Sequence, residues 1–365
     1  MAFRSIKTYS YRNLEDQKVE IEASRNFLIG SNGQGKSNFL ETLYLLSYGS
    51  SFRTNHLREL IRKEKSEMAL HGTFIRPEEE DITGSISLRL DRKEKSIFLN
   101  EKKVQDRKQL ISNLPAIVFS HDDISFINGP PERRRWFFNQ IMSLFDPFFI
   151  DTLREYRKIL KMRNNVLKQK QLNLIPVYNQ QLSSKGLEIQ NKRDEVITEF
   201  NKVVAPIFDT IAKLEKPFRI EYKPSWKNLK GQNEILKVLE SQTDRDLLYG
   251  TTTTGPHRDR FIFRLEEIDF ARIASTGQLR LMSLILRIGQ SRYFSDKTGR
   301  RPILLLDDVL LELDGERRNR FLGELPEYEQ IFFTFLPDER YLELVDEDTA
   351  MYWVENGCIR RMKSG

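Results

Sequence analysis

Short stretches of alternating apolar and polar residues dominate the first hundred residues of the chain. This alternation indicates strands with one buried face. It occurs at residues 3–10, 17–23, 68–75, 82–90 and 95–99. Between these stretches, residues 36–48 and 56–65 have the apolar spacing of helices. A compact apolar run at residues 116–120 is typical of a fully buried strand, so the chain begins with an α/β unit.

A helical pattern replaces the alternation between about Glu132 and Leu214. Gly186 is the only glycine of this stretch, and its apolar residues recur at helical spacing. Pro147 and Pro176 separate the stretch into several helices, because proline cannot donate a backbone hydrogen bond inside a helix. For the same reason Pro206 predicts a kink or a break.

Strand patterns return after about Lys216. The expected strands lie at residues 218–222, 261–265, 303–308, 330–336, 351–355 and 358–362. A long helix is expected at residues 278–294, and a short one follows the strand that ends near residue 308. We therefore predict an α/β head in two parts, residues 1–125 and 217–365, interrupted by a helical lobe at residues 126–216.

Composition and charge limit the class of protein. Lys and Arg number 59 against 53 Asp and Glu, which gives a net charge of +6. This mild excess excludes a polycation but allows a local basic face. One cysteine, Cys358, and four scattered histidines offer no disulfide framework and no zinc-ligand spacing. The first residues lack the apolar run of a signal peptide and no apolar stretch is long enough to span a bilayer, so we expect a cytoplasmic protein with no membrane partner.

The sequence GSNGQGKS at residues 30–37 satisfies the pattern of a phosphate-binding loop. An apolar strand pattern precedes it and a helical pattern follows it, which is the order that the chemistry requires. Glycines let backbone N–H groups close around phosphate oxygens, and the helix N-terminus adds its dipole. Lys36 is predicted to reach the β- and γ-phosphates of a nucleotide, and the Ser37 hydroxyl is predicted to hold Mg²⁺.

Two carboxylates follow the apolar strand that begins at residue 303. Asp307 stands at its carboxyl end, where α/β sheets place their ligands, and is predicted to bind Mg²⁺ in the Walker-B role. Asp308 is then positioned to polarise an attacking water. Read alone, this stretch is an ordinary buried strand with an acidic edge; paired with the phosphate loop, it is specific.

A third motif stands 30 positions before Asp307, where Ser275, Gly277 and Gln278 form a Ser-x-Gly-Gln turn at the start of a helical pattern. Such a turn can be a plain helix N-cap. In split ATPase heads it contacts the γ-phosphate that the opposite subunit holds. The wide separation of Lys36 and Asp307 favours such a split head over a simple kinase or small GTPase.

The whole chain resembles the RecF family, bacterial recombination-repair ATPases whose heads are related to those of SMC proteins and ABC transporters. The resemblance depends on residues 30–37, 51–61, 118–137, 156–168, 251–260, 275–280 and 304–314. It implies an ABC/SMC-type P-loop ATPase head, a mixed sheet with helices, that a helical lobe interrupts.

The resemblance also implies a function. Two heads close around two ATP molecules with Mg²⁺, and the closed dimer binds DNA, double-stranded or at junctions with single strands, without sequence specificity. Slow, DNA-stimulated hydrolysis reopens it. Proteins of the family act with RecO and RecR to direct RecA onto gapped DNA during repair, replication restart and the SOS response.

Residue roles follow from matching the motifs. The triphosphate is assigned to the run Gly30, Ser31, Asn32, Gly33, Gln34, Gly35, Lys36 and Ser37. Asp307 and Ser37 are assigned to Mg²⁺, and Asp308 with Lys36 to catalysis. Ser275, Gly277, Gln278 and the loop residue Asp314 are assigned to contacts across the dimer.

The chain departs from the family pattern at several positions. Arg260 follows the His257-Arg258-Asp259 run where an acidic residue is usual in the family. Asn139 and His121 also stand in atypical places.

A localised DNA-binding face is the last prediction. Basic residues follow the phosphate-loop helix, namely Arg53, Arg58, Arg62, Lys63 and Lys65. For each of them alone, a solvated surface charge is the competing interpretation.

Two alternative classes of protein remain, a transporter ATPase and a small-molecule kinase. A transporter ATPase usually has Asp-Glu where this chain has Asp307 and Asp308, and a histidine after the next strand.

Overall fold

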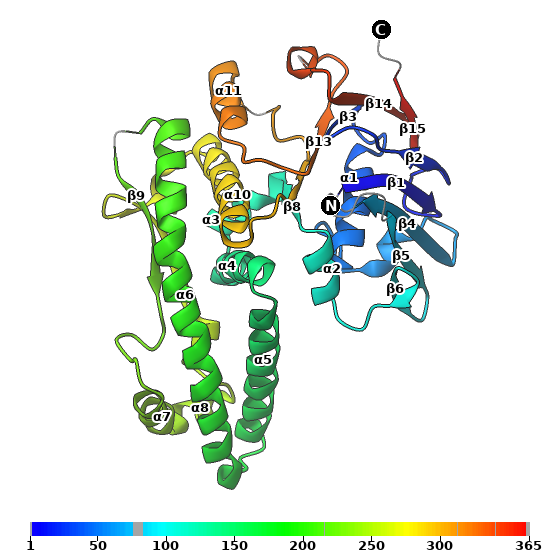
Figure 1. Cartoon of the computed structure of the whole chain (residues 1–365). Helices are drawn as coiled ribbons and strands as arrows, with labels where there is room; N and C mark the ends of the chain where they lie inside the picture. Colours follow the sequence, from blue (N-terminus) through cyan, green and yellow to red (C-terminus); the bar gives the residue numbers. More distant parts are fainter. Residues whose placement is uncertain (1, 76–82, 215, 312, 340, 363–365) are drawn as a thin grey trace. The chain divides into compact units, whose positions relative to one another are not determined.

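The computed structural model describes residues 2–75, 83–214, 216–311, 313–339 and 341–362. Its internal contacts divide the chain into two compact units. Unit 1 consists of Met1–His121 and Thr298–Gly365, and unit 2 consists of Asp122–Lys297. Figure 1 shows the chain with both units.

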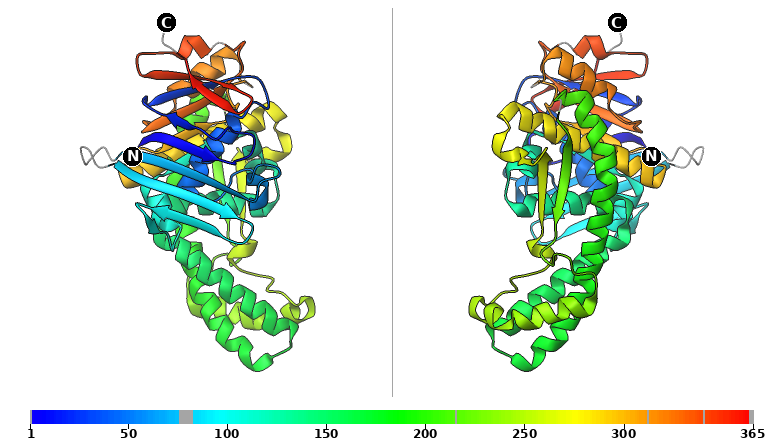
Figure 2. Two further views of the ribbon diagram at one scale, coloured as in Figure 1. Left: turned by 90° about the vertical axis from the view of Figure 1, so that its right-hand side faces the viewer. Right: turned by 90° about the vertical axis from the view of Figure 1, so that its left-hand side faces the viewer.

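The described residues of unit 1 form two six-stranded sheets. The first is an antiparallel sheet in the order β2-β1-β4-β5-β6-β7, whose blue and cyan strands lie side by side in the left view of Figure 2. Its strands are β1 (Ala2–Tyr9), β2 (Lys18–Glu20), β4 (Glu67–Ile75), β5 (Thr83–Asp91), β6 (Lys95–Leu99) and β7 (Lys102–Lys103). Every second residue of β4 and β5 is buried, because successive side chains of a strand point to opposite faces.

The second sheet has the order β15-β14-β3-β13-β12-β8. Its members are β3 (Arg25–Ile29), β8 (Ala116–Phe119), β12 (Ile303–Leu306), β13 (Gln330–Phe335), β14 (Thr349–Glu355) and β15 (Cys358–Arg361). All of these strands run parallel except β15, which is antiparallel to β14. Strands β12 and β13 are buried throughout, as expected of parallel strands covered on both faces.

Helices α1 (Lys36–Tyr48), α2 (Lys108–Asn113) and α11 (Gly315–Gly323) complete unit 1, with the short 3-10 helices η1 (Leu57–Leu60) and η5 (Tyr341–Leu344). Helix α1 is buried on nearly all sides because it packs against both sheets. It follows β3, and β13 lies between β3 and β12. The carboxyl ends of these three strands therefore meet at one edge of the second sheet, where α/β folds place ligands.

Unit 2 is mainly helical. Its helices are η2 (His121–Ile124, which begins one residue earlier), α3 (Ser125–Asn128), α4 (Pro131–Phe145), α5 (Pro147–Lys168), η3 (Leu172–Leu174), α6 (Ile175–Ala212), α7 (Gln232–Ser241), α8 (Thr243–Tyr249), η4 (Pro256–Arg258), α9 (Phe270–Ile273) and α10 (Thr276–Thr298). An antiparallel sheet of β9 (Phe218–Lys223), β10 (Arg260–Leu265) and β11 (Ile268–Asp269) packs on α4 and α6. The long helices α5 and α6 pack along each other, as all views show (Figures 1 and 2).

One local prediction is wrong, and of the kink or break predicted at Pro206 the break does not occur. The expected helix at 56–65 is only the 3-10 turn η1, because residues beside it pair with the end of β1: the Arg12 N–H donates to the Leu60 carbonyl and the Arg62 N–H to the Ser10 carbonyl. Helix α6 continues through Pro206 without a break. Buried side chains on both sides of the proline, Val204 and Ile207, hold the helix in its packing and outweigh one missing hydrogen bond.

The other predicted elements are confirmed within the described residues, among them the helices at 36–48 and 278–294 and the strand at 116–120. Ile82, the first residue of the strand expected at 82–90, lies outside the described residues. Unit 2 contains the predicted lobe, residues 126–216, and continues to Lys297, since β9 and α7 pack against α6. The three-part division at 1–125, 126–216 and 217–365 stays a proposal.

Candidate nucleotide-binding site

The loop between β3 and α1 has the backbone geometry of an anion cradle. Gly33 has φ 79° and Gly35 has φ 119°, in the left-handed region that favours glycine. A Cβ atom on Gly35 would lie 2.7 Å from the Leu14 side chain, and one on Gly30 would lie 2.2 Å from the Val354 carbonyl oxygen. Three glycines of the motif are thus required by the conformation or by the space around them.

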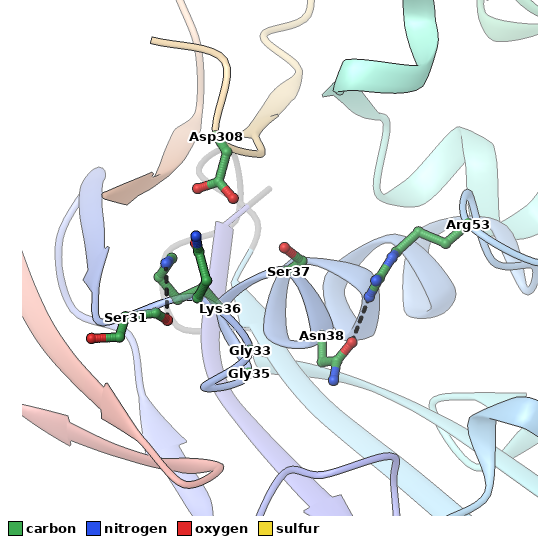
Figure 3. A pocket seen from close by; sticks show the side chains of 9 residues that line it. Ser31, Gly33, Gly35, Lys36, Ser37, Asn38, Arg53 and Asp308 are labelled. Carbon is green, nitrogen blue, oxygen red and sulfur yellow. Dashed lines mark hydrogen bonds between the residues drawn. The ribbon is translucent and has the colours of Figure 1, made fainter. Parts of the chain in front are cut away.

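Lys36 is the first residue of α1 and is almost fully buried. Its Nζ donates to the carbonyl oxygens of Gly30, at 2.6 Å, and Ser31, at 3.3 Å, so the ammonium group is held across the loop. Figure 3 shows Lys36 beside Ser31. The first turn of α1 contains no acidic residue. The cation, the free amides of the helix N-terminus and the helix dipole all favour an anion at this place.

Ser37 and Asp307 lie in contact although 270 positions separate them. The Ser37 hydroxyl donates to Asp307 Oδ1 at 2.7 Å. Burial, and then the neighbouring Asp308 carboxylate, raise the pKa of Asp307 to about 6, while the hydrogen bond from Ser37 opposes the rise. A hydroxyl and a carboxylate are hard oxygen donors that fit Mg²⁺, which takes few protein ligands and completes its shell with water and phosphate oxygens. The two residues can hold such an ion, and its charge would favour the ionised form of Asp307.

Asp308 has a left-handed backbone, with φ 54°. Its N–H donates to the Thr334 hydroxyl oxygen at 2.7 Å, and that hydroxyl donates to Asp308 Oδ1, also at 2.7 Å. Thr334 comes from β13, the neighbour of β12, so sheet order brings it to Asp308. Thr334 was not predicted as a site residue; its place in the strand that follows the Asp307–Asp308 pair was the available signal.

Glu339 follows the same strand and was also missed. Its Oε1 accepts from the Leu336 N–H at 2.6 Å, and its Oε2 is buried with no hydrogen-bond partner among the described residues. Burial, and then Asp308, raise the pKa of Glu339.

A pocket of about 140 Å³ lies over the loop. It is lined by Ser31, Asn32, Gly33, Gly35, Lys36, Ser37, Asn38, Arg53 and Asp308 (Figure 3). The pocket is small for a nucleotide, since sites that enclose a ligand of this size usually have 300 Å³ or more. The described residues of unit 1 therefore supply a phosphate-sized hollow over the loop and not a closed nucleotide site.

Two predicted residues contact other parts of unit 1. Arg53, expected on a DNA-facing surface, lines this pocket and donates to Asn38 Oδ1 at 2.5 Å. Gln34 faces the turn between β14 and β15, where its Oε1 accepts from the Asn356 N–H at 2.5 Å. Of the remaining basic candidates, Arg58, Lys63 and Lys65 are exposed. Arg62 is engaged by Asp16 at 2.8 Å.

The Ser-x-Gly-Gln turn caps α10 in unit 2. The Ser275 N–H donates to Gln278 Oε1 at 2.8 Å and the Gln278 N–H donates to the Ser275 hydroxyl at 3.3 Å, a reciprocal capping arrangement. Ser275 and Gly277 are exposed, and a Cβ atom on Gly277 would meet nothing within 4 Å. In unit 1, Asp314 caps α11 by accepting from the Arg317 N–H. Neither the turn nor Asp314 lines the pocket.

The 251–260 motif folds inward within unit 2. The Asp259 carboxylate is buried and accepts from Arg193 at 2.6 Å and from the Tyr222 hydroxyl at 2.5 Å. The His257 ring lies between the Tyr156 hydroxyl and the Thr252 carbonyl. These residues make contacts inside unit 2, so the motif has a structural role in addition to any other role.

No helix in the described parts of the chain combines the length and the apolarity needed to cross a membrane.

The parallel sheet, the phosphate loop and the carboxylates after β12 define a P-loop ATPase head of the ABC/SMC type. The family model described as the RecF/RecN/SMC N terminal domain matches residues 2–360. The DNA replication and repair protein RecF of Treponema pallidum (strain Nichols) is 37% identical over 357 residues, covering 96% of this chain and 98% of the relative. The chain belongs to the RecF family.

Further relatives agree. The RecF protein of Leptospira interrogans is 31% identical over 368 residues, with full coverage of both chains. A solved structure of the recombination mediator protein RecF-ATP in the RecFOR pathway superposes with a TM-score of 0.88 at 27% identity, over 99% of this chain and 97% of that one. An Smc head bound to the C-winged helix domain of ScpA, at 12% identity and a TM-score of 0.56, shares the fold.

Proposed function

We propose that this protein is an ATP-dependent DNA-binding dimer that acts in recombinational repair of gapped DNA, with RecO and RecR, to load RecA. The observation that carries the proposal is the incomplete nucleotide site. Unit 1 offers a cradle that fits phosphate but does not enclose a nucleotide, and unit 2 presents an exposed helix N-terminus with Ser275 and Gln278. A second copy that docks its turn against the γ-phosphate would complete both sites.

The relatives support the same function. The relatives from Treponema pallidum and Leptospira interrogans are DNA replication and repair proteins RecF, and the solved recombination mediator protein is RecF-ATP of the RecFOR pathway. ATP, RecO and RecR are therefore the ligand and partners that we propose for this chain.

The residues of the site have distinct tasks in this proposal. Lys36 and the loop amides hold the β- and γ-phosphates, and Ser37 with Asp307 would hold Mg²⁺, which neutralises charge on the phosphates. Asp308 takes the proton of the attacking water, and Thr334 holds its carboxylate in place. Aspartate is a shorter base than the glutamate of transporter heads, so turnover should be slow and hydrolysis should act as a release switch.

DNA binding would be electrostatic. The exposed Arg58, Lys63 and Lys65 contact phosphates in this proposal, and no sequence specificity is expected. The logarithm of affinity should fall with the logarithm of salt concentration by about 0.9 per phosphate neutralised.

The test compares three variants by light scattering and by duplex binding, with and without ATP. Lys36→Met should lose ATP binding. Ser275→Arg should bind ATP but fail to dimerise and fail to bind DNA, because the larger cation blocks the turn. Ser241→Arg, which adds the same charge on α7, should behave like the unchanged protein. Normal ATP-dependent dimers of Ser275→Arg would overturn the proposal.

A further inference from the structure

The far end of the α5–α6 pair in unit 2 has a small core of its own. Val166 and Leu167 at the end of α5 and Ile175 at the start of α6 are buried together. Tyr178 of α6 and Leu247 of α8 pack against them. The buried Arg163–Asp246 ion pair, 2.7 Å long, ties α8 to α5 beside this core. The end of α5, η3, the start of α6 and α8 therefore form one packed structure, called here the arm tip.

The arm tip exposes an unusual number of apolar side chains. In the described part of the chain 14 large hydrophobic residues are exposed, and six of them lie within residues 162–177 and 248–249. They are Met162, Leu172, Leu174, Val177, Leu248 and Tyr249, with exposed fractions from 38% to 80%. Several of these exposed residues are direct neighbours in sequence of residues that belong to the small core or pack against it. Large apolar side chains that stay exposed on one packed structure favour a site of interaction.

The same tip carries uncompensated positive charge. Arg157, Lys158, Lys161, Lys168 and Lys170 are exposed, and the structure shows no ion pair for any of them among the described residues. No Asp or Glu occurs between Glu155 and Glu188. On α8 the exposed Asp244 and Arg245 cancel, and α7 nearby adds a net charge of −1 from Glu234, Lys237 and Glu240. The tip as a whole remains strongly basic.

We propose that the arm tip binds a protein partner through an acidic segment that also presents apolar side chains. Carboxylates of such a segment would meet the five cations, and its apolar side chains would cover Leu172, Val177 and Leu248. Charge complementarity would speed the encounter and the apolar contact would hold it. The arm tip shares no residue with the lining of the nucleotide pocket.

Two other occupants fit the tip less well. A second copy of the tip would place cations against cations, which is repulsive. Duplex DNA would satisfy the cations through its phosphates but would leave the apolar side chains in water, because protein contacts to the DNA backbone are polar.

The test uses a short fluorescent peptide of Asp, Glu, Leu and Phe, titrated by anisotropy against the full chain without nucleotide. Two matched peptides replace either the apolar residues by Ser or the acids by Gln. A labelled DNA duplex is titrated in parallel. Binding of the first peptide at least about tenfold tighter than either matched peptide is expected.

Variants locate the binding. Lys161→Glu with Lys168→Glu should weaken peptide binding about tenfold and flatten its salt dependence. Leu172→Ser with Leu248→Ser should weaken it about tenfold at every salt concentration. Lys202→Glu with Lys227→Glu is the matched control; Lys202 lies ~40 Å along α6 from Ile175. All six side chains are exposed, and circular dichroism verifies the fold.

Equal peptide affinity in tip and control variants would overturn the proposal. So would loss of duplex binding, without loss of peptide binding, in the tip variants, since it would assign the tip to DNA. Failure of ATP-dependent dimerisation concerns the proposed function and leaves this result unaffected.

Discussion

His257 should make unit 2 sensitive to acid. Its Nε2 lies 3.0 Å from the Thr252 carbonyl oxygen, which can only accept, so Nε2 carries the proton of the neutral ring. Nδ1 then accepts from the Tyr156 hydroxyl at 2.8 Å. Burial, and then the nearby cations Arg258 and Arg135, outweigh the bond to Thr252 and lower the pKa of His257 from 6.5 to about 4.

The direction of the effect on stability follows from proton linkage. Between pH 4 and pH 6.5 the unfolded chain binds more protons at His257 than the folded one does, so stability falls as the pH falls. The contribution is fully present above about pH 6.5 and is lost as the pH approaches 4. This lowering of the His257 pKa corresponds to about 3 kcal/mol of stability, and partial exposure of the ring reduces the contribution to about 1–3 kcal/mol.

Urea unfolding at several pH values between about 4.5 and 8 measures this contribution. Trp226 is a suitable probe, because it is buried in unit 2 and its Nε1 donates to Thr254. Trp136→Phe and Trp353→Phe leave it as the only tryptophan of the chain. The control is His257→Gln, whose amide can still donate to the Thr252 carbonyl but does not titrate.

The unfolding free energy of the unchanged protein should fall more steeply toward acid than that of His257→Gln. Carboxylates elsewhere affect both proteins equally and cancel in the difference. Parallel curves for the two proteins, or an NMR titration that places the His257 pKa at 6 or above, would refute the reasoning.

Three further substitutions test other contacts. Asp123→Ala leaves the buried guanidinium of Arg287, now 2.6 Å from that carboxylate, without its partner and should cost about 3–5 kcal/mol in urea unfolding. Gly35→Ala forces a side chain into φ 119° and should weaken ATP binding by at least about 1–2 kcal/mol in calorimetry, without unfolding the protein. Thr334→Val removes the hydroxyl that Asp308 binds; single-turnover ATP hydrolysis should slow by at least about tenfold at unchanged ATP affinity, and Thr334→Ser should restore it.

The elements that sequence patterns predicted well are those that are locally determined. Strand β12 and helix α1 have strong apolar patterns. Charged residues follow the strand and a glycine-rich loop precedes the helix, so these boundaries could be predicted from the sequence. The helix expected at 56–65 does not form because a tertiary interaction competes with it. That interaction is the pairing with the end of β1, which depends on residues about fifty positions earlier in the chain. No local pattern contains that information.

The site shows the same division. The phosphate loop could be predicted because its chemistry requires a contiguous run of residues. Thr334 and Glu339 could not be, since their part depends on sheet order, β3-β13-β12, which brings the end of β13 to Asp308. Arg53 was grouped by its charge with its basic neighbours, and its contact with Asn38 Oδ1 in the pocket could not be predicted from that charge.

The buried ion pairs of unit 2 share a feature that the number of charged residues in the sequence does not reveal. Three ion pairs in the described residues have both side chains at most 5% exposed, and all lie in unit 2: Arg163–Asp246, Arg193–Asp259 and Arg287–Asp123. Desolvation offsets most of the attraction in such pairs, so well-packed apolar residues would stabilise the unit about as well. Each pair instead joins α5, α6 or α10 to a segment 66 or more positions away, and a misaligned helix would leave the charge buried and unpaired. We infer that these pairs specify how the long helices align, and therefore that α10, which carries Ser275 and Gln278 at its start, is held in one register within the unit.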